Sequence, residues 1–124
     1  MKIKQINEDE IVFDNNYKLK YYHEQDCCES VYADFEMLKN YNVSVKTGKN
    51  INIKEIEFVE TLELLIDGVP EAGFNIISIT GEKFFIPCYN EQNGYYSSDL
   101  ELILDKGKTQ EIMDISEFVK DDIY

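Results

Sequence analysis

The chain has 124 residues, of which 44% are hydrophobic, a composition that suits one globular domain and excludes a disordered protein. Twenty-five acidic residues against twelve lysines, with no arginine, give a net charge of −13, so we expect no direct nucleic-acid binding and a basic partner instead. The sequence contains no apolar run near the roughly 20 residues that span a membrane and no apolar N-terminal signal segment, which predicts a cytoplasmic protein without membrane contact.

The N-terminal part predicts a β-hairpin. Residues 11–13 and 17–21 each alternate apolar with polar side chains, which is the period of a half-buried strand. Between these segments, Asn15 and Asn16 can adopt the left-handed backbone conformations of a tight turn.

The segment YYHEQDCCESVY, residues 21–32, contains the single histidine, His23, and two of the three cysteines, Cys27 and Cys28. With Cys88 these side chains would supply four donors to zinc, but adjacent residues of a strand point to opposite faces, so Cys27 and Cys28 cannot converge on one ion. A catalytic cysteine is disfavoured because its acidic neighbours would raise the thiol pKa. We favour a structural turn with reduced cysteines and expect neither metal nor cofactor; a partner-binding loop is the alternative.

The middle of the chain predicts a helix and then a long strand. Residues 35–41 place apolar side chains at the spacing of one short helix. From 53 to 66 the even positions are mostly apolar, whereas Glu55, Glu57 and Glu63 occupy odd positions. This pattern indicates a strand with an acidic outer face.

The next segments predict a second hairpin. Residues 68–73 read as a loop, 74–79 as a strand, 80–83 as a turn and 84–90 as the partner strand. Pro87 cannot donate a ladder hydrogen bond, which predicts an edge strand or a bulge there.

The C-terminal part predicts another turn, a strand and a helix. Asn93-Gly94 is a hairpin signal, and residues 96–104 alternate, with Asp99 and Glu101 opposite the apolar face. Residues 109–120 carry an apolar stripe at helical spacing. The elements together predict an α+β fold, namely a mainly antiparallel twisted β-sheet with one or two short helices packed on one face, in a single domain, 1–124.

Two segments carry a family resemblance. His23, Gln25, Asp26, Cys27, Cys28, Glu29 and Val31 form the pattern H-x-Q-D-C-C-E-x-V, and Asn93, Gly94, Tyr95, Tyr96 and Ser97 form N-G-Y-Y-S. The chain resembles a family of small uncharacterised proteins of bacteriophages and bacterial genomes over residues 10–104, with the 109–120 helix as its own addition. The resemblance implies a phage or mobile-element origin and brings no known activity. We expect the two motifs to lie close together.

Charge and resemblance together predict a non-enzymatic accessory protein that binds and inhibits a host protein with a basic surface, in the host cytoplasm. Nucleic-acid-handling and defence factors, the targets of anti-restriction and anti-CRISPR proteins, are the expected class, and a homodimer is compatible with the sequence. The carboxylates expected at the contact are Glu55, Glu57, Glu63, Asp99, Glu101, Glu111, Asp114, Glu117, Asp121 and Asp122. The alternatives are charge that serves solubility alone, or a ligand-binding, metal-binding or catalytic protein that uses His23, Cys27, Cys28 and Glu29 with Tyr95 and Tyr96.

Overall fold

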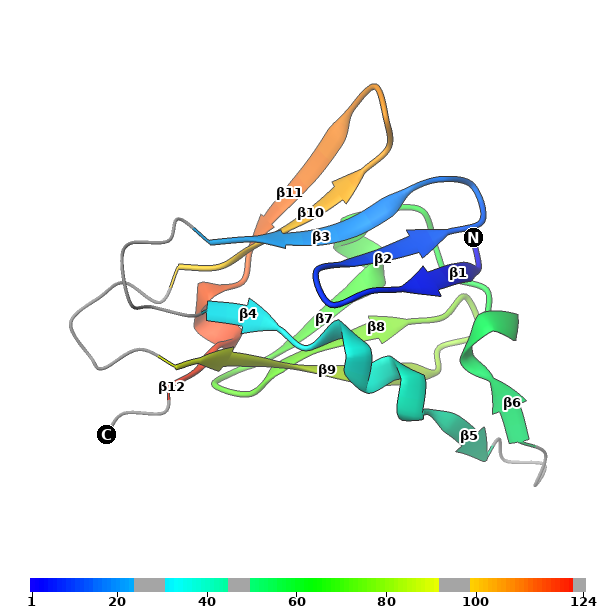
Figure 1. Cartoon of the computed structure of the whole chain (residues 1–124), viewed down its shortest axis with the longest axis horizontal. Helices are drawn as coiled ribbons and strands as arrows, with labels where there is room; N and C mark the ends of the chain where they lie inside the picture. The colour runs from blue at the N-terminus through cyan, green and yellow to red at the C-terminus, as the bar shows by residue number, and fades with distance from the viewer. Residues whose placement is uncertain (24–30, 45–49, 92–98, 122–124) are drawn as a thin grey trace.

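The computed structural model describes residues 1–23, 31–44, 50–91 and 99–121, and its strands form two main sheets (Figure 1). The first sheet is antiparallel, in the order β1-β2-β3-β10-β11. Its strands are β1 (Ile3–Ile6), β2 (Glu10–Phe13), β3 (Lys18–Tyr22), β10 (Glu101–Asp105) and β11 (Gln110–Asp114).

The second sheet has the order β12-β9-β8-β7, and β4 pairs with β9 as well. Its strands are β4 (Val31–Ala33), β7 (Ile66–Val69), β8 (Gly73–Ile77), β9 (Lys83–Asn90) and β12 (Lys120–Asp121), and all pair antiparallel except β12 with β9. The strands β5 (Asn42–Ser44) and β6 (Asn50–Asn52) form a separate small hairpin.

Helical structure is confined to short segments in the described residues. These are η1 (Phe35–Asn40), η2 (Ile53–Glu55), α1 (Leu62–Leu65) and η3 (Ser116–Phe118). The predicted α+β fold dominated by antiparallel sheet is confirmed. No helix of the described residues is long and apolar enough to cross a membrane.

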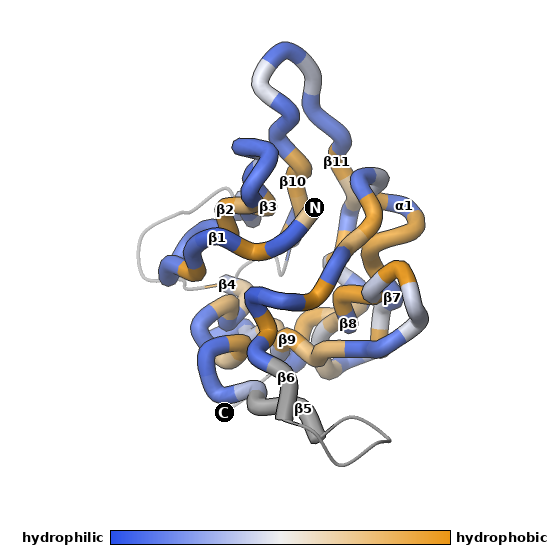
Figure 2. The backbone as a smooth tube through the Cα atoms, turned by 90° about the vertical axis from the view of Figure 1, so that its right-hand side faces the viewer, coloured by the Kyte–Doolittle hydropathy of each residue, from blue (hydrophilic) through white to orange (hydrophobic). Residues whose placement is uncertain are grey.

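The core lies between the two sheets, and Figure 2 colours the hydrophobic residues of their strands orange. A chain of aromatic rings connects the layers: the ring centroid of Phe58 lies 6.4 Å from that of Phe13 on β2 and 5.8 Å from that of Phe84 on β9. All three side chains are buried. The alternation that predicted half-buried strands therefore fills one continuous core.

Several predicted elements are confirmed. Strands β2 and β3 form the first hairpin, with Asn16 at φ 69° in its turn. Strands β8 and β9 form the second hairpin, and the helix expected at 35–41 is present as η1. However, β9 is an interior strand rather than an edge, and Pro87 is accommodated because pairing with β8 ends there and pairing with β4 begins at Cys88.

The long strand predicted over 53–66 is wrong. Residues 53–55 form η2, residues 62–65 form α1, and only the single bridges Lys2↔Glu57 and Phe58↔Ser78 lie between them. Leu62 and Leu65 are buried while Leu64 is 65% exposed, so this end of the segment follows helical rather than alternating spacing.

The helix predicted over 109–120 is also wrong, because β11 occupies its first half. Gly107, at φ 89°, allows the tight turn in which the N–H of Lys106 donates to the carbonyl of Thr109, and β11 then pairs with β10 along its whole length. Ile112 is 57% exposed and Met113 packs on the core, which is the period of a strand. Pairing with a neighbouring strand overrides the helical spacing.

Candidate functional site: an acidic hollow lined by tyrosines

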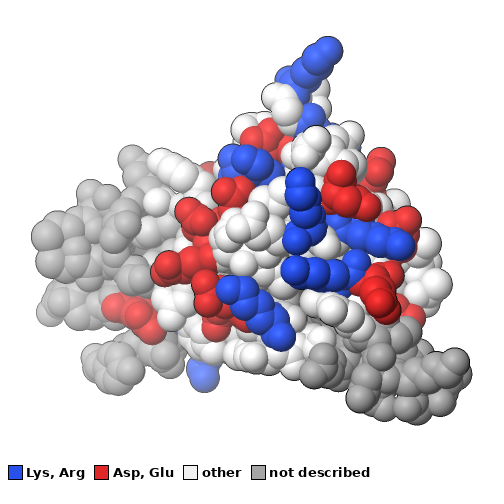
Figure 3. Space-filling view, turned by 45° about the vertical axis from the view of Figure 1, so that its right-hand side comes forward, with Lys and Arg blue, Asp and Glu red and all other residues white. Residues whose placement is uncertain are grey.

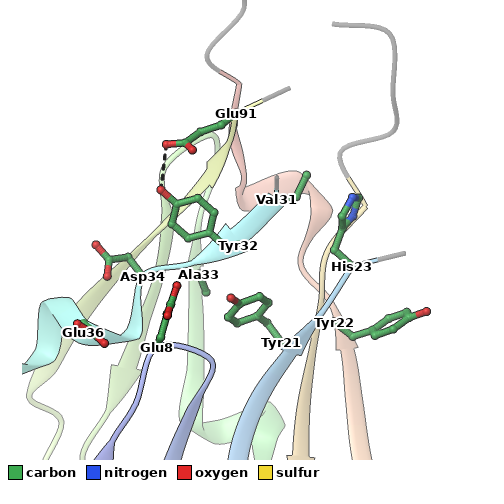
Figure 4. A pocket seen from close by; sticks show the side chains of 10 residues that line it. All are labelled: Glu8, Tyr21, Tyr22, His23, Val31, Tyr32, Ala33, Asp34, Glu36 and Glu91. Atoms are coloured by element: carbon green, nitrogen blue, oxygen red, sulfur yellow. Dashed lines mark hydrogen bonds between the residues drawn. The ribbon is translucent and has the colours of Figure 1, made fainter. Parts of the chain in front are cut away.

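A hollow of about 700 Å³ opens beside the ends of β3 and β4 (Figure 4). We call it the acidic hollow. Its carboxylates are Glu8, Asp34, Glu36 and Glu91, its aromatic residues are Tyr21, Tyr22, Tyr32 and His23, and Val31 and Ala33 complete the lining. No lysine is among these described lining residues.

The β4 strand places Tyr32 at the hollow by alternation. Val31 and Ala33 are buried in the core, so Tyr32 between them points the other way. Its ring packs against Tyr89 of β9 in a tilted orientation, at a centroid distance of 5.6 Å. The Tyr32 hydroxyl donates a hydrogen bond of 3.0 Å to Oε1 of Glu91 (Figure 4). Burial and this bond raise the pKa of Tyr32 to about 12.

Tyr21 comes from the end of β3 and reaches the hollow from the opposite sheet. Its ring packs against Phe35 at a centroid distance of 5.5 Å, and Figure 4 shows it pointing toward Glu8, whereas Tyr22 points away. Burial raises the pKa of Tyr21, and the negative charges of Asp9 and Glu8 raise it further. The hydroxyl therefore lies in a negative electrostatic field.

His23 lies at the rim of the hollow, one residue beyond β3. Its Nδ1 is 2.5 Å from the backbone carbonyl oxygen of Asp99. A carbonyl oxygen only accepts hydrogen bonds, so Nδ1 carries the hydrogen, and this contact fixes the ring at the entrance to β10.

Carboxylates and tyrosine rings together favour a cationic guest. A guanidinium or ammonium group can donate to several carboxylates, and its charge is also attracted to the face of an aromatic ring. The described residues contain no cluster of three His, Cys, Asp or Glu side chains placed to hold a metal ion. Cys88 is buried in β9, and burial raises the pKa of its thiol to about 12, so the thiol is protonated and a poor nucleophile at neutral pH.

A family model described as a domain of unknown function (DUF7448) matches residues 1–102. The chain belongs to this family. No curated protein and no solved structure matches the chain. All lining residues of the acidic hollow fall within the DUF7448 region, whereas β11 lies beyond it.

The acidic residues singled out in the sequence lie elsewhere on the DUF7448 chain. Glu57 pairs with the N-terminal ammonium group at 3.0 Å, and Glu111 accepts from the backbone N–H of Leu62 at 2.8 Å. Asp114 accepts from the backbone N–H of Ser116 at 2.9 Å. These three carboxylates therefore make contacts that hold the fold.

The remaining predicted carboxylates are spread over several elements instead of one strand face. Glu55 belongs to η2, Glu63 to α1, Asp99 precedes β10, Glu101 belongs to β10 and Glu117 to η3; the side chain of Asp121 and the whole of Asp122 lie outside the described residues. None of the described side chains among them lines the hollow. On the face shown in Figure 3, lysine and acidic side chains are interleaved.

The two sequence motifs fall largely outside the described residues. This holds for Gln25, Asp26, Cys27, Cys28 and Glu29 of the first motif and for Asn93, Gly94, Tyr95, Tyr96 and Ser97 of the second. Their described flanks do meet, because His23 contacts Asp99, and Val31 pairs with Asn90 in register. The proximity of the motifs themselves stays a prediction.

Sequence reasoning missed the four carboxylates of the hollow. They come from the β1–β2 turn, from the entrance to η1, from η1 itself and from the end of β9, so no local pattern connects them. The available signal was the tyrosine pair beside the first motif, Tyr21 and Tyr22.

Proposed function

We propose that this DUF7448 protein is a non-enzymatic binding protein whose acidic hollow receives lysine or arginine side chains of a basic partner protein. The observation that carries the proposal is the lining: Glu8, Asp34, Glu36 and Glu91 face one hollow together with tyrosine rings, and no lysine is among the described lining residues. A net charge of −13 would also steer a basic partner toward the protein from a distance.

The wider proposal concerns biological context. The resemblance to phage and bacterial small proteins supports an accessory protein of a phage or mobile element that acts in the host cytoplasm. A host nucleic-acid-handling or defence factor is the partner class that fits the charge, because such proteins carry basic grooves for DNA or RNA. Inhibition would follow from occupation of the groove, as with anti-CRISPR and anti-restriction proteins.

A binding role is also supported by the state of the reactive groups among the described residues. Cys88 is buried with a thiol pKa of about 12, and the His23 ring is held by the Asp99 carbonyl at the rim. A buried, protonated thiol is not an activated nucleophile.

The test is affinity capture of partners from host lysate, followed by binding measurements on the captured protein. Replacing Glu8 and Glu36 with glutamine removes two exposed carboxylates from the hollow, and we expect at least about tenfold weaker binding. The matched control replaces Glu55 and Glu63, which are also exposed and lie outside the hollow, and should change affinity by less than about twofold.

Two outcomes would contradict the proposal. Loss of binding only in the Glu55 and Glu63 variant would move the contact to the surface expected from the sequence. Parental binding in both variants would show that neither set of carboxylates contacts the partner. Binding to the parent should also weaken steeply with salt, because exposed charges are screened within about 8 Å at physiological ionic strength.

A small cationic ligand is a second candidate, favoured by the size of the hollow. About 700 Å³ lies within the range of about 300–1,000 Å³ that is usual for small-molecule sites. Calorimetric titration with spermidine and with arginine amide tests it. Saturable binding that the Glu8 and Glu36 variant loses would favour this candidate, and no heat with either compound would exclude it for these cations.

A further inference from the structure

The outer edge of β11 is an open sheet edge. It is the last strand of the first sheet, and the hairpin that it forms with β10 projects away from the rest of the fold (Figures 1 and 2). No described strand pairs with its outer side. The helix α1 lies near β11, and its Leu62 N–H donates to Glu111, whose side chain is on the same face of the strand as the core-packed Met113.

The register of the hairpin shows which backbone groups face this edge. The N–H of Lys106 donates to the carbonyl of Thr109, and the N–H of Ile115 donates to the carbonyl of Leu100. These two pairs are therefore bonded, and bonded and non-bonded pairs alternate along an antiparallel ladder. The β11 residues of the non-bonded pairs are Gln110, Ile112 and Asp114, so their N–H and C=O groups point outward.

Edge strands usually carry features that prevent pairing with another chain. The opposite edge of the same sheet has them, because β1 contains a register irregularity between Ile3 and Gln5 and an exposed Lys4. Along β11 the pairing with β10 is regular, there is no proline, and Ile112 is 57% exposed at the centre of the strand.

We propose that β11 pairs antiparallel with β11 of a second copy of this chain, which would join the two first sheets into one. A two-fold axis at Ile112 places each Ile112 opposite the other and each Gln110 opposite the partner's Asp114. In this register the outward N–H and C=O groups of Ile112 bond to those of Ile112 in the second copy. Those of Gln110 bond to the outward groups of Asp114 in the second copy. The exposed isoleucine side chains become a cross-strand pair shielded from water.

Charge complementarity along the hairpin favours this second copy as the occupant. The tip carries Lys106 and Lys108, the other end of β11 carries Asp114, and Glu117 follows in η3. Antiparallel pairing brings the basic tip of each chain beside the acidic end of the other. A parallel arrangement would oppose like charges instead.

The test uses the full chain at physiological salt, because each copy carries a charge of −13. Sedimentation from low micromolar to millimolar concentration should show a monomer–dimer equilibrium. Ile112→Lys should raise the dissociation constant at least about tenfold, because the two substituted lysines would face each other across the two-fold axis. Lys108→Glu should raise it several-fold. Ile79→Lys is the matched control, because Ile79 is 58% exposed and lies outside β11, and it should leave the equilibrium unchanged.

Amide hydrogen exchange provides a readout that does not depend on a variant. At low concentration the amides of Glu111 and Met113, bonded to β10, should exchange slowly, while those of Gln110, Ile112 and Asp114 exchange fast. At high concentration the outward amides should become protected. The proposal would be overturned if the chain stayed monomeric up to millimolar concentration. It would also be overturned if a dimer formed that Ile112→Lys did not weaken and in which the outward amides of β11 gained no protection.

Discussion

Tyr32 shows how a single residue connects the core to the acidic hollow. Its neighbours on β4 are buried, its ring packs on Tyr89, and its hydroxyl holds the exposed carboxylate of Glu91 at the rim. A carboxylate fixed in this way is preorganised for a cation, because it loses little further freedom on binding. Tyr32 thus positions the negative charge of Glu91, a residue that follows the end of β9.

We predict that Tyr32→Phe lowers stability at neutral pH and that the difference disappears at high pH. The Glu91 bond should contribute about 0.5–1 kcal/mol at pH 7. The folded-state pKa of about 12 lies above the unfolded value near 10, so the folded state keeps its proton longer. This stability is fully present below pH 10 and is lost as the pH rises toward about 12.

Urea unfolding of both proteins at pH 7 and across the alkaline range measures this convergence. All other tyrosines are common to the two chains, so their titration cancels in the difference. A gap between the two free energies of unfolding that does not change with pH would show that the hydroxyl makes no proton-linked contribution.

At the scale of elements, the contact between β7 and η3 ties the C-terminal segment to the second sheet. Gly68 of β7 lies directly under the Phe118 ring, and a Cβ at Gly68 would stand 2.1 Å from the ring. The backbone N–H of Glu71 also donates to the carbonyl of Glu117. The apolar residues of 109–120 whose spacing predicted a helix therefore pack on the fold from β11 and from η3.

We predict that Gly68→Ala destabilises the fold by about 1–3 kcal/mol, because the methyl group displaces the half-buried Phe118 ring. Thermal or denaturant unfolding measures the cost. In a Phe118→Ala background the same change should cost much less, since the obstructing ring is absent. Equal costs in both backgrounds would mean that the ring does not press on Gly68.

For the whole molecule, the dominant electrostatic feature is the excess of acidic over basic residues. The first sheet exposes both signs of charge, with Lys20 paired to Asp105 at 3.3 Å and Lys18 near Glu10 at 3.8 Å. The acidic residues outnumber the lysines, so most carboxylates have no lysine to pair with and the net charge is −13. These carboxylates repel one another in the folded protein and lower its stability.

We therefore predict opposite salt effects on folding and on binding. Raising ionic strength from about 0.01 to 0.15 M shortens the Debye length from about 30 to 8 Å, so the melting temperature should rise as self-repulsion is screened. Over the same range, affinity for the basic partner should fall. Calorimetric melts and binding titrations in matched buffers test this, and parallel trends would contradict the electrostatic account.

The sequence by itself determined the strands whose burial follows a local period of two. The β2–β3 and β8–β9 hairpins could be predicted because alternation and the turn residues lie within a few positions of one another. Net charge likewise needs no structure, and the basic partner that it predicts stays a prediction.

Two features were decided only by the tertiary structure. One is the secondary structure of segments whose apolar spacing does not fix a helix or a strand, and the other is the site where residues distant in sequence meet. Residues 109–120 satisfy helical spacing, yet hydrogen bonding of β11 to β10 selects a strand. The 53–66 segment forms η2, which lies against β1, and α1, which lies against β11, instead of one strand. The acidic hollow joins Glu8, Tyr21, Asp34 and Glu91 from four separate segments. Such a site depends on sheet pairing over long sequence separation, which no local period encodes.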